Sequence, residues 1–277
     1  MKALVIGGSS WDTLIHVNQI KELKDDMMLL AEKTNESVGG TGAGKSLCLD
    51  ALGVETTLIT ELGRDIQRER IVSFFNQTKI KLIDIEVDKT VTHTNIMHAK
   101  GKRISILTGQ PKIESKIHQD AEILVKEAEV VYLNINNFCR QYIPLIKKYK
   151  KLCVVDIHDY DTGNLYHQDF IDVADILTGS EINISNPQKF MEEQINLGKR
   201  LVVLTNGDKG LRALDDQSKS YNLEGYTDIE YVDSNGAGDS FCSGMVTHYL
   251  NTKDVGESLK IGAICGALAC TSINLFN

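Results

Sequence analysis

The sequence predicts an α/β protein whose central sheet is mostly parallel and covered by helices. Short runs of β-branched residues alternate with longer helical patterns along most of the chain, which is the pattern of strands joined by crossover helices. Two stretches, about 13–38 and 92–108, break this rhythm with segments that alternate polar and apolar residues. We expect these stretches to form a small accessory sheet that projects from the main body as a lid.

Each expected element of the main body follows from its local pattern. The expected strands are Ala3–Ile6, Thr57–Thr60, Val130–Leu133, Leu152–Asp156, Ile176–Thr178 and Leu201–Thr205. The expected helices are Gly44–Leu52, Arg68–Thr78, Ile117–Ala128, Ile143–Lys150 and Val255–Ile273. Small residues dominate the last helix, so we expect close backbone packing against the main sheet.

The lid is expected to contain a hairpin. Thr94–His98 and Arg103–Leu107 alternate in polarity, and Lys100-Gly101-Lys102 separates them. Exposed sheet edges invite pairing, so a homodimer through the lid is one possible assembly. The chain has three prolines and no obvious linker, which favours a single domain over residues 1–277.

Composition restricts the class of protein. Of the 277 residues, 42% are hydrophobic and 25% are charged, and the formal net charge is −8. This balance argues against broad binding to nucleic acid or anionic membranes, but it is compatible with a small anionic ligand. The six cysteines lack CxxC spacing, and no apolar segment reaches transmembrane length. We therefore expect a cytoplasmic protein without a zinc site or a disulfide framework.

A glycine-flanked turn near the C-terminus is the strongest local signal. Asn235-Gly236-Ala237-Gly238-Asp239 leads into apolar residues at helical spacing. The first N–H groups of a helix have no partner within it, and the helix dipole favours negative charge, so the turn is suited to phosphate. Asp239 then lies where a general base is useful. Taken alone, an aspartate after glycine is more often a helix cap or a first-turn acid.

A second glycine loop competes with the first. Gly39–Ser46 fits the Walker A pattern GxxxxGK[ST]. A phosphate-binding loop of this kind must follow a buried strand, whereas residues 32–38 are too polar for a central strand. Leu152–Asp156 resembles a Walker B segment, but a parallel strand ending at the functional rim explains it more simply. A P-loop NTPase using Lys45 and Ser46 remains an alternative.

Beyond these patterns, Val232–Phe241 resembles the DTxGAGDxF signature of the PfkB, or ribokinase-like, family of carbohydrate and nucleoside kinases. The resemblance covers most of the chain. Val5–Asp12 is similar to the family's first strand, which ends in a substrate-binding aspartate, and Gly39–Gly53 is similar to its GG motif and following helix. Val203–Gly210 is similar to the TxGxxG strand end that contacts the nucleotide. The resemblance implies a ribokinase-like fold in which the accessory hairpins form the β-lid.

The resemblance also implies roles for individual residues. The implied catalytic residues are the base Asp239 and an anion hole of Gly236, Ala237 and Gly238. The implied substrate-binding residues are Asp12, Gly39, Gly40, Gly44 and Lys45. The implied ATP-binding residues are Ser180, Asn183, Thr205, Gly207, Gly210 and Asn274. Asp233 is the candidate for a monovalent-cation loop.

Two positions depart from the family pattern. Many relatives carry a sugar-binding asparagine where this chain has Gly44. The family's NxxE element, which helps to organise magnesium and phosphate, aligns with Ser180–Asn183, so both of its marked side chains differ.

The sequence thus predicts an ATP- and Mg²⁺-dependent kinase, with K⁺ as a possible further cofactor, that phosphorylates a primary hydroxyl of a sugar or sugar-like molecule. Phosphoryl transfer needs mainly positioning and charge stabilisation, which such a turn and base supply. The alternatives are a nucleoside kinase of the same family, a P-loop NTPase and a non-catalytic ligand sensor. Under the kinase hypothesis, Asp239→Asn abolishes turnover and retains nucleotide binding, whereas Lys45→Ala mainly changes substrate affinity.

Overall fold

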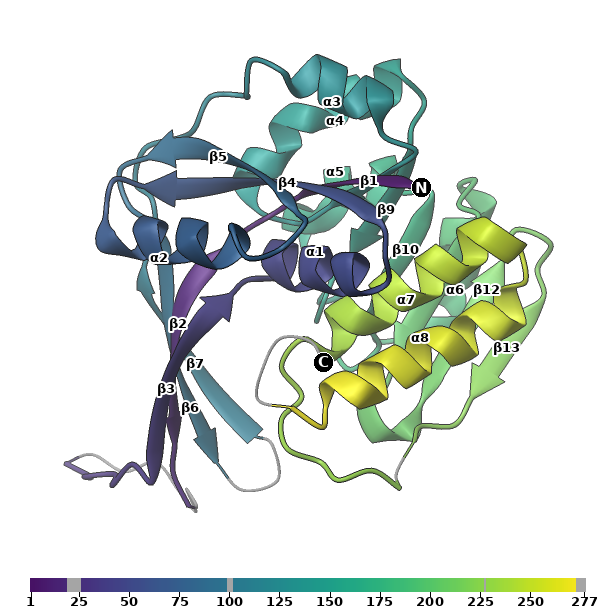
Figure 1. Cartoon of the computed structure of the whole chain (residues 1–277). Coiled ribbons are helices and arrows are strands. Elements are labelled where there is room, and N and C mark those ends of the chain that lie inside the picture. The colour runs from purple at the N-terminus through teal and green to yellow at the C-terminus, as the bar shows by residue number, and fades with distance from the viewer. Residues whose placement is uncertain (19–25, 99–101, 227, 273–277) are drawn as a thin grey trace.

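The computed structural model describes residues 1–18, 26–98, 102–226 and 228–272, and it contains two sheets (Figure 1). The larger sheet has nine strands in the order β13-β12-β11-β10-β9-β8-β1-β4-β5. In chain order these strands are β1 (Lys2–Ile6), β4 (Glu55–Gly63), β5 (Lys81–Val87), β8 (Val130–Leu133), β9 (Leu152–Asp156), β10 (Ile176–Ser180), β11 (Leu201–Thr205), β12 (Leu211–Asp215) and β13 (Ser220–Leu223).

All neighbours from β11 to β5 pair in parallel, and only β12 and β13 are antiparallel. The central strands are apolar almost throughout because both of their faces are covered. In β1, for example, the four residues Ala3–Ile6 are all buried. The predicted parallel sheet is therefore confirmed, and β5, β12 and β13 extend it.

Helices cover both faces of the large sheet (Figure 1). One core cluster includes side chains from α3 (Ala121–Glu127), α4 (Ile143–Lys148), α5 (Gln168–Val173) and α6 (Pro187–Asn196). The other includes side chains from α1 (Thr41–Ala51), α2 (Ile66–Phe75), α7 (Ala237–Thr252) and α8 (Val255–Ala269). The described residues also form three 3₁₀ helices: η1 (Asn137–Tyr142), η2 (Leu165–His167) and η3 (Gly207–Lys209). No helix in the described ranges has both the length and the apolar character needed to cross a bilayer.

The smaller sheet is the predicted lid, and its order is β3-β2-β6-β7. Its strands are β2 (Ser10–His16), β3 (Lys33–Gly39), β6 (Val91–His98) and β7 (Lys102–Gly109). The antiparallel pairing of β6 with β7 confirms the expected hairpin, whose turn at 99–101 lies outside the described residues. Asp12 lies within β2 of the lid, so the expectation that it ends the first central strand was wrong.

The small-residue helix α8 packs differently from the prediction. Its main neighbour is α7 rather than the large sheet, and the two helices run side by side (Figure 1). A Cβ at Gly244 of α7 would lie 2.5 Å from the Cys265 sulfur, and one at Gly262 of α8 would lie 2.7 Å from Met245 Cβ. Glycine at these two positions therefore sets the close approach of the helices.

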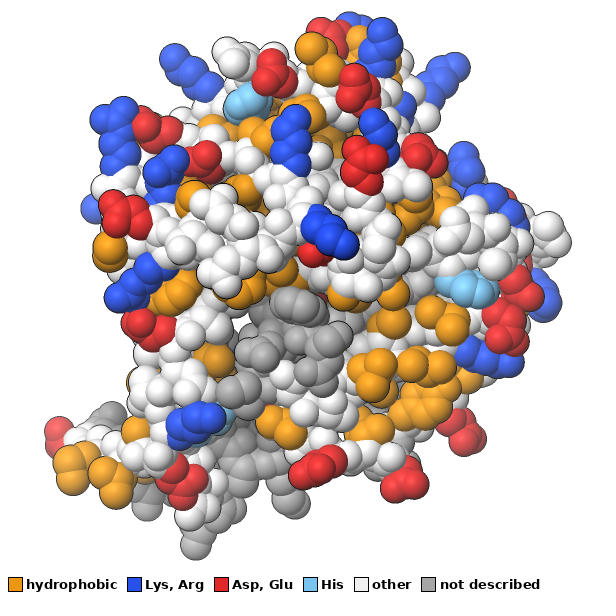
Figure 2. All heavy atoms as spheres, viewed as in Figure 1, with side chains coloured by type: hydrophobic (Ala, Val, Ile, Leu, Met, Phe, Trp, Pro, Cys, Tyr) orange, Lys and Arg blue, Asp and Glu red, His pale blue; other side chains and the backbone are white. Residues whose placement is uncertain are grey.

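Charged side chains of both signs are interspersed on the face shown in Figure 2, with no continuous basic stripe among the described residues of that face. This distribution agrees with the net charge of −8. Large apolar side chains such as Ile264 and Leu268 are exposed on α8.

Candidate active site

The N-terminus of α7 forms the centre of the candidate site. Gly236 caps this helix with φ 79°, a left-handed conformation that favours glycine. The N–H group of Ala237 donates to the Ser234 carbonyl, and that of Ser240 donates to the Gly236 carbonyl. The N–H groups of Gly238 and Asp239 have no hydrogen-bond partner among the described residues. Of the three residues predicted to form an anion hole, Ala237 thus has its N–H group already engaged.

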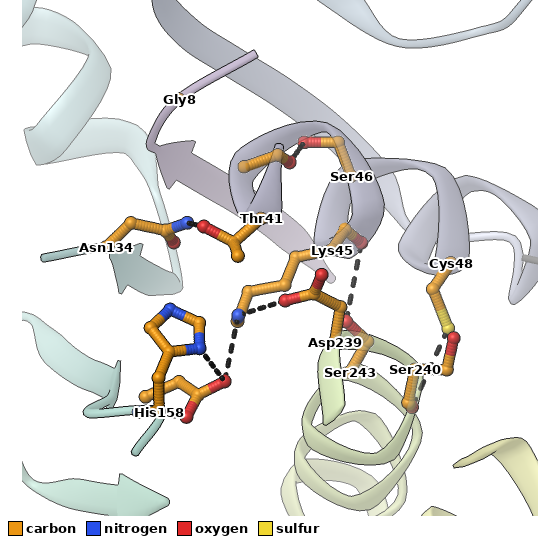
Figure 3. A network of polar contacts seen from close by, with 12 residues as sticks. Gly8, Thr41, Lys45, Ser46, Cys48, Asn134, His158, Asp239, Ser240 and Ser243 are labelled. Atoms are coloured by element: carbon orange, nitrogen blue, oxygen red, sulfur yellow. Dashed lines mark hydrogen bonds and ion pairs between the residues drawn. The ribbon is translucent and has the colours of Figure 1, made fainter. Parts of the chain in front are cut away.

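The side chain of Asp239 takes part in a buried ion cluster (Figure 3). The Lys45 ammonium contacts Oδ1 of Asp239 and lies 3.2 Å from Oδ2 of Asp156. Asp156 ends β9, and its Oδ1 accepts a hydrogen bond from the His158 N–H at 3.0 Å. Lys45 is only 1% exposed and Asp239 only 7% exposed. Lys45 is therefore a buried member of an ion cluster and not a solvated surface lysine.

The surroundings of the cluster shift the pKa values of its two carboxylates, Asp239 and Asp156, in opposite directions. Burial raises the pKa of Asp239 above its ordinary value, and the Lys45 ammonium opposes that rise only in part. Burial also acts on Asp156, but His158 and Lys45 outweigh it and lower the pKa of Asp156 to about 2. Burial disfavours the Lys45 ammonium, whereas Asp239 and Asp156 raise its pKa well above the usual range. Lys45 and Asp156 are therefore ionised at neutral pH, and Asp239 is the carboxylate better suited to accept a proton.

The segment from Gly39 to Gly44 lies against the carboxylates of Asp12 and Asp239. A Cβ at Gly39 would overlap the Asp12 carboxylate, and one at Gly44 would lie 2.6 Å from Oδ2 of Asp239. Gly40 between them has φ 93°, and a Cβ there would lie 2.5 Å from the Gly8 carbonyl oxygen. These three predicted substrate-binding glycines therefore let the backbone of α1 and β3 approach both Asp12 and Asp239.

Asp12 is held by polar side chains of the lid. The Ser10 hydroxyl donates to its Oδ1 at 2.6 Å. Nδ1 of His93 lies 3.1 Å from the same oxygen, and the Asn95 amide donates to Oδ2 at 3.3 Å. Asp12, His93 and Asn95 come from the neighbouring strands β2 and β6, in which Asp12 and His93 are register partners. The lid thus presents a polar cluster beside the glycine turn.

A cavity of about 660 Å³ lies beside the start of α7. Its lining includes Thr205, Gly207 and Gly210, which are predicted to bind ATP, and Ala237 and Gly238, which are predicted to bind the phosphoryl group. The structure therefore brings these two predicted groups together. Thr205 ends β11, where its hydroxyl donates to the Gly179 carbonyl at 3.2 Å.

The remaining predicted ATP-binding residues lie elsewhere. The Ser180 hydroxyl accepts a bond from the Ile182 N–H at 3.3 Å, and the Asn183 amide donates to the Asp159 carbonyl at 3.1 Å. Neither residue lines the 660 Å³ cavity. Glu181, between them, receives the Asn206 amide at 2.5 Å and pairs with Arg212. Asn274 lies outside the described residues.

Asp233 has one oxygen that the described residues leave without a partner. It is 1% exposed, and its Oδ1 accepts the Asn235 N–H at 2.9 Å. Oδ2 is buried and has no hydrogen-bond partner among the described residues. A buried carboxylate oxygen of this kind is compatible with a bound cation.

Sequence reasoning missed several residues of this region. The aromatic side chains Tyr226 and Tyr231 and the small residues Ala263, Gly266 and Ala267 line the cavity. The small-residue pattern of α8 was visible in the sequence, but its contact with a cavity was not. Asp156 was predicted to lie at the functional rim, and its pairing with Lys45 depends on contacts between distant segments.

The P-loop alternative is wrong because its structural requirement fails. The strand before Gly40 is β3, which is largely exposed and belongs to the lid sheet. Lys45 is bonded by two carboxylates, and the Ser46 hydroxyl donates to the Gly42 carbonyl at 2.8 Å (Figure 3).

The residues present fit ATP with Mg²⁺. The lining of the 660 Å³ cavity includes apolar and aromatic side chains and also Gly238, whose N–H group has no partner among the described residues, and this combination suits a base and phosphates. The described residues contain no group of three or more His, Cys, Asp or Glu side chains arranged to hold a metal. Mg²⁺ commonly binds through substrate phosphates with one or two carboxylates, so it needs no such cage.

The sequence and the fold are similar to those of known carbohydrate kinases. The family model for pfkB family carbohydrate kinases matches residues 2–276. The acarbose 7(IV)-phosphotransferase of Actinoplanes sp. is 26% identical over 97% of this chain and 91% of its own length. The ribokinase of Dictyostelium discoideum is 25% identical over 96% of this chain and 93% of its own length. Among solved structures, the microbiome-derived acarbose kinase Mak1 has a TM-score of 0.87 at 24% identity, covering all of this chain and 94% of that one. This structural likeness shows a shared ribokinase-like fold.

Proposed function

The chain belongs to the pfkB family of carbohydrate kinases, and on that premise we propose that it transfers the γ-phosphoryl group of ATP to a primary hydroxyl of a sugar-like acceptor, with Asp239 as the general base. One observation carries the proposal. A buried carboxylate with a raised pKa lies in the first turn of α7, where Ala237 and Gly238 line a cavity of about 660 Å³ and the N–H groups of Gly238 and Asp239 have no partner among the described residues.

The residues of the chain divide the work of phosphoryl transfer. When bound, ATP supplies the phosphoryl group and Mg²⁺ neutralises its phosphate charge. Asp239 accepts the hydroxyl proton, and the N–H groups of Gly238 and Asp239 stabilise the negative charge of the phosphoryl group in the transition state. A donor of this kind contributes roughly 3 kcal/mol to transition-state stabilisation. Thr205, Gly207 and Gly210 form the adjoining wall of the nucleotide cavity.

The acceptor is proposed to bind between the lid and the glycine turn. Asp12 and His93 offer a hydrogen-bond acceptor and a ring nitrogen, which suit the hydroxyl groups of a polyhydroxylated molecule. The names of the Actinoplanes relative and of the Mak1 kinase make acarbose the first acceptor to test. Ribose is the second, because of the Dictyostelium relative. A nucleoside such as cytidine tests the nucleoside-kinase alternative.

A coupled ADP-release assay with these acceptors tests the function. We expect acceptor-dependent ADP formation with Mg-ATP and a phosphorylated product by mass spectrometry. Binding of ATP and a sugar without any phosphorylated product across the panel would favour the ligand-sensor alternative. A thermal-shift measurement with the same compounds reports binding independently of turnover, since a ligand that binds the native state raises the melting temperature.

The variant Asp239→Asn tests the assignment of the base. Asparagine keeps the shape of the side chain but cannot accept the proton, so kcat should fall by about 10²–10⁴-fold. ATP binding should be retained, as measured by calorimetry with a non-hydrolysable analogue. Wild-type kcat in Asp239→Asn would show that another group is the base.

We further propose that Asp233 contributes to a monovalent-cation site. The support is the buried Oδ2 that has no partner within the described ranges. Activity should be higher in KCl than in tetramethylammonium chloride at equal ionic strength, and Asp233→Asn should remove most of this difference. Equal rates of the wild type in the two salts would overturn the proposal.

A further inference from the structure

Lys45 is the least expected member of the buried cluster. Its side chain extends from α1 into the space between β9 and α7, where it meets Asp156 and Asp239. Moving an ammonium group out of water is costly, and a buried ion pair is often no more stable than a well-packed apolar substitute. Stability alone therefore gives no clear reason for a lysine here. The contact of Lys45 with the proposed base, Asp239, suggests a functional reason instead.

The two oxygens of Asp239 have different surroundings. Oδ1 contacts the Lys45 ammonium. Oδ2 faces the backbone of Gly44, where a Cβ would lie only 2.6 Å away, and it has no hydrogen-bond partner among the described residues. Because residue 44 is glycine, no Cβ occupies the space beside Oδ2. Asp239 thus has one oxygen that is held and one that is available.

We propose that Lys45, itself held by Asp156, is a positioning residue that fixes Oδ1 of Asp239 and so directs Oδ2 toward the acceptor hydroxyl. The inference rests on the proposed function, because it assigns a role relative to that base. It also differs from the sequence-based prediction that Lys45→Ala mainly changes substrate affinity.

The proton balance of the step is as follows. The acceptor oxygen forms a bond to the γ-phosphorus, the bond from that phosphorus to the β–γ bridging oxygen breaks, and the hydroxyl proton moves to Oδ2 of Asp239. Lys45 stays protonated throughout, because the two carboxylates hold its pKa well above its ordinary value. The ammonium therefore orients the base and does not compete for the transferred proton.

Replacing Lys45 changes the charge that acts on Asp239. The titratable groups that face Asp239 from α1, the end of β9 and α7 are Lys45, Cys48, Asp156, His158 and Cys242. Lys45 lowers the pKa of Asp239 and Asp156 raises it. Loss of the lysine alone should therefore raise the pKa of Asp239 further. Loss of both Lys45 and Asp156 leaves the summed charge of Lys45, Asp156 and Asp239 unchanged at neutral pH. It removes the contact of the Lys45 ammonium with Oδ1 of Asp239.

The experiment compares Lys45→Met, Asp156→Asn and the double variant with the wild type. A matched control is Lys199→Met, since Lys199 is another buried lysine, 4% exposed, whose ammonium donates to the carbonyls of Ile171 and Ala174. Two quantities are measured: the pH dependence of kcat/KM with the acceptor identified in the panel, and the titration of Asp239 by NMR in protein labelled with ¹³Cγ-aspartate. The Asp239 resonance is assigned by its absence in Asp239→Asn.

In Lys45→Met, we expect the acid limb of the kcat/KM profile and the NMR midpoint of Asp239 to move to higher pH by about one unit or more. The double variant keeps the charge of the cluster balanced, so we expect it to fold even if Lys45→Met does not. Its acid limb and its NMR midpoint should shift less than those of Lys45→Met. Its kcat should remain at least about tenfold below the wild type at its own pH optimum, because Oδ1 is no longer held. KM for ATP should be unchanged, and Lys199→Met should lower the melting temperature without moving either titration.

Wild-type kcat and an unshifted acid limb in the double variant would overturn the proposal, because they would show that Lys45 only balances charge. An equal shift in Lys199→Met would also overturn it. Failure of the proposed function is a different result, namely a wild type that phosphorylates none of the acceptors, and the NMR titration can still be measured in that case.

Discussion

At the scale of single residues, Gly44 determines how closely helix α1 approaches the proposed base. The Cβ that any other residue would add lies 2.6 Å from Oδ2 of Asp239, a distance that real Cβ contacts essentially never show. Asp239 is also held through Oδ1 by Lys45, so its carboxylate cannot move aside without losing that contact. The chain thus combines a missing side chain at 44 with a buried cation at 45.

The variant Gly44→Ala should therefore impair catalysis more than folding. The added methyl displaces the carboxylate or fills the space for the acceptor hydroxyl, and a misplacement of about 1 Å can reduce the rate by about 10²-fold. We expect kcat to fall by at least about tenfold, with ATP affinity unchanged by calorimetry. Gly256→Ala is the matched control, since that helical glycine has its nearest neighbour atom 3.5 Å from the added Cβ. A Gly44→Ala enzyme with wild-type kcat would mean that Oδ2 does not face the acceptor.

At the scale of elements, the lid contacts the loop that precedes α7. Arg103 of β7 donates from Nη1 to Oδ1 of Asn235 at 2.7 Å. The same Asn235 donates its N–H to Asp233. A single residue of the loop thus connects the lid with the start of the proposed anion-binding turn, although the lid strand and the turn lie far apart in the sequence.

Loss of this contact should weaken the coupling between the lid and the phosphate site. A hydrogen bond from a charged donor contributes about 1.5–3 kcal/mol when buried and less at an exposed position. We expect Arg103→Gln to reduce kcat/KM for the acceptor by roughly three- to tenfold, measured in the ADP-release assay. Lys33→Gln on the exposed strand β3 removes a lid cation without this contact and should stay near the wild type. If the two variants had equal effects, general lid charge rather than the Asn235 contact would be responsible.

At the scale of the whole molecule, the sequence was sufficient for six of the nine described strands of the large sheet and for most of the helices around it, whereas β5, β12, β13, α5 and α6 were not predicted. Buried parallel strands such as β8 (Val130–Leu133) and β11 (Leu201–Thr205) have the predicted bounds because continuous β-branched runs are a strong local signal. The strand β2 was harder to place, since Ser10–His16 continues an extended segment that leaves the main sheet for the lid. Only pairing with β3 and β6 determines that change of sheet.

The part of the candidate site that lies within one segment of the sequence was predictable. Asp239 and its glycine turn lie within one motif, and Ala237 and Gly238 of that motif line the same cavity as the predicted Thr205, Gly207 and Gly210. The buried cluster was not predictable in this way. Lys45 and Asp156 are 111 residues apart, and Lys45 and Asp239 are 194 apart, so no local pattern indicates their contact. The element against which α8 packs was predicted wrongly for the same reason, since small residues permit close packing without specifying the partner.

The buried cluster should also affect the acid stability of the whole molecule. The folded-state pKa of Asp156 is about 2, below the ordinary 3.8, so its ionised form favours the folded state. This contribution is fully present above about pH 4 and is lost as the pH falls through about 2. A shift of this size corresponds to about 2–3 kcal/mol in the free energy of unfolding.

We therefore expect Asp156→Asn to be less stable than the wild type by about 2–3 kcal/mol at pH 6, with the difference shrinking between pH 4 and pH 2. Urea unfolding at a series of pH values measures this difference directly, because effects shared by both proteins cancel. Asp84→Asn is the control, since Asp84 pairs with Arg68 at 2.8 Å at a partly exposed position, where the loss should be below about 1 kcal/mol. A difference for Asp156→Asn that does not change with pH would show that the lost stability comes from packing, because only an ionised carboxylate can make it depend on pH.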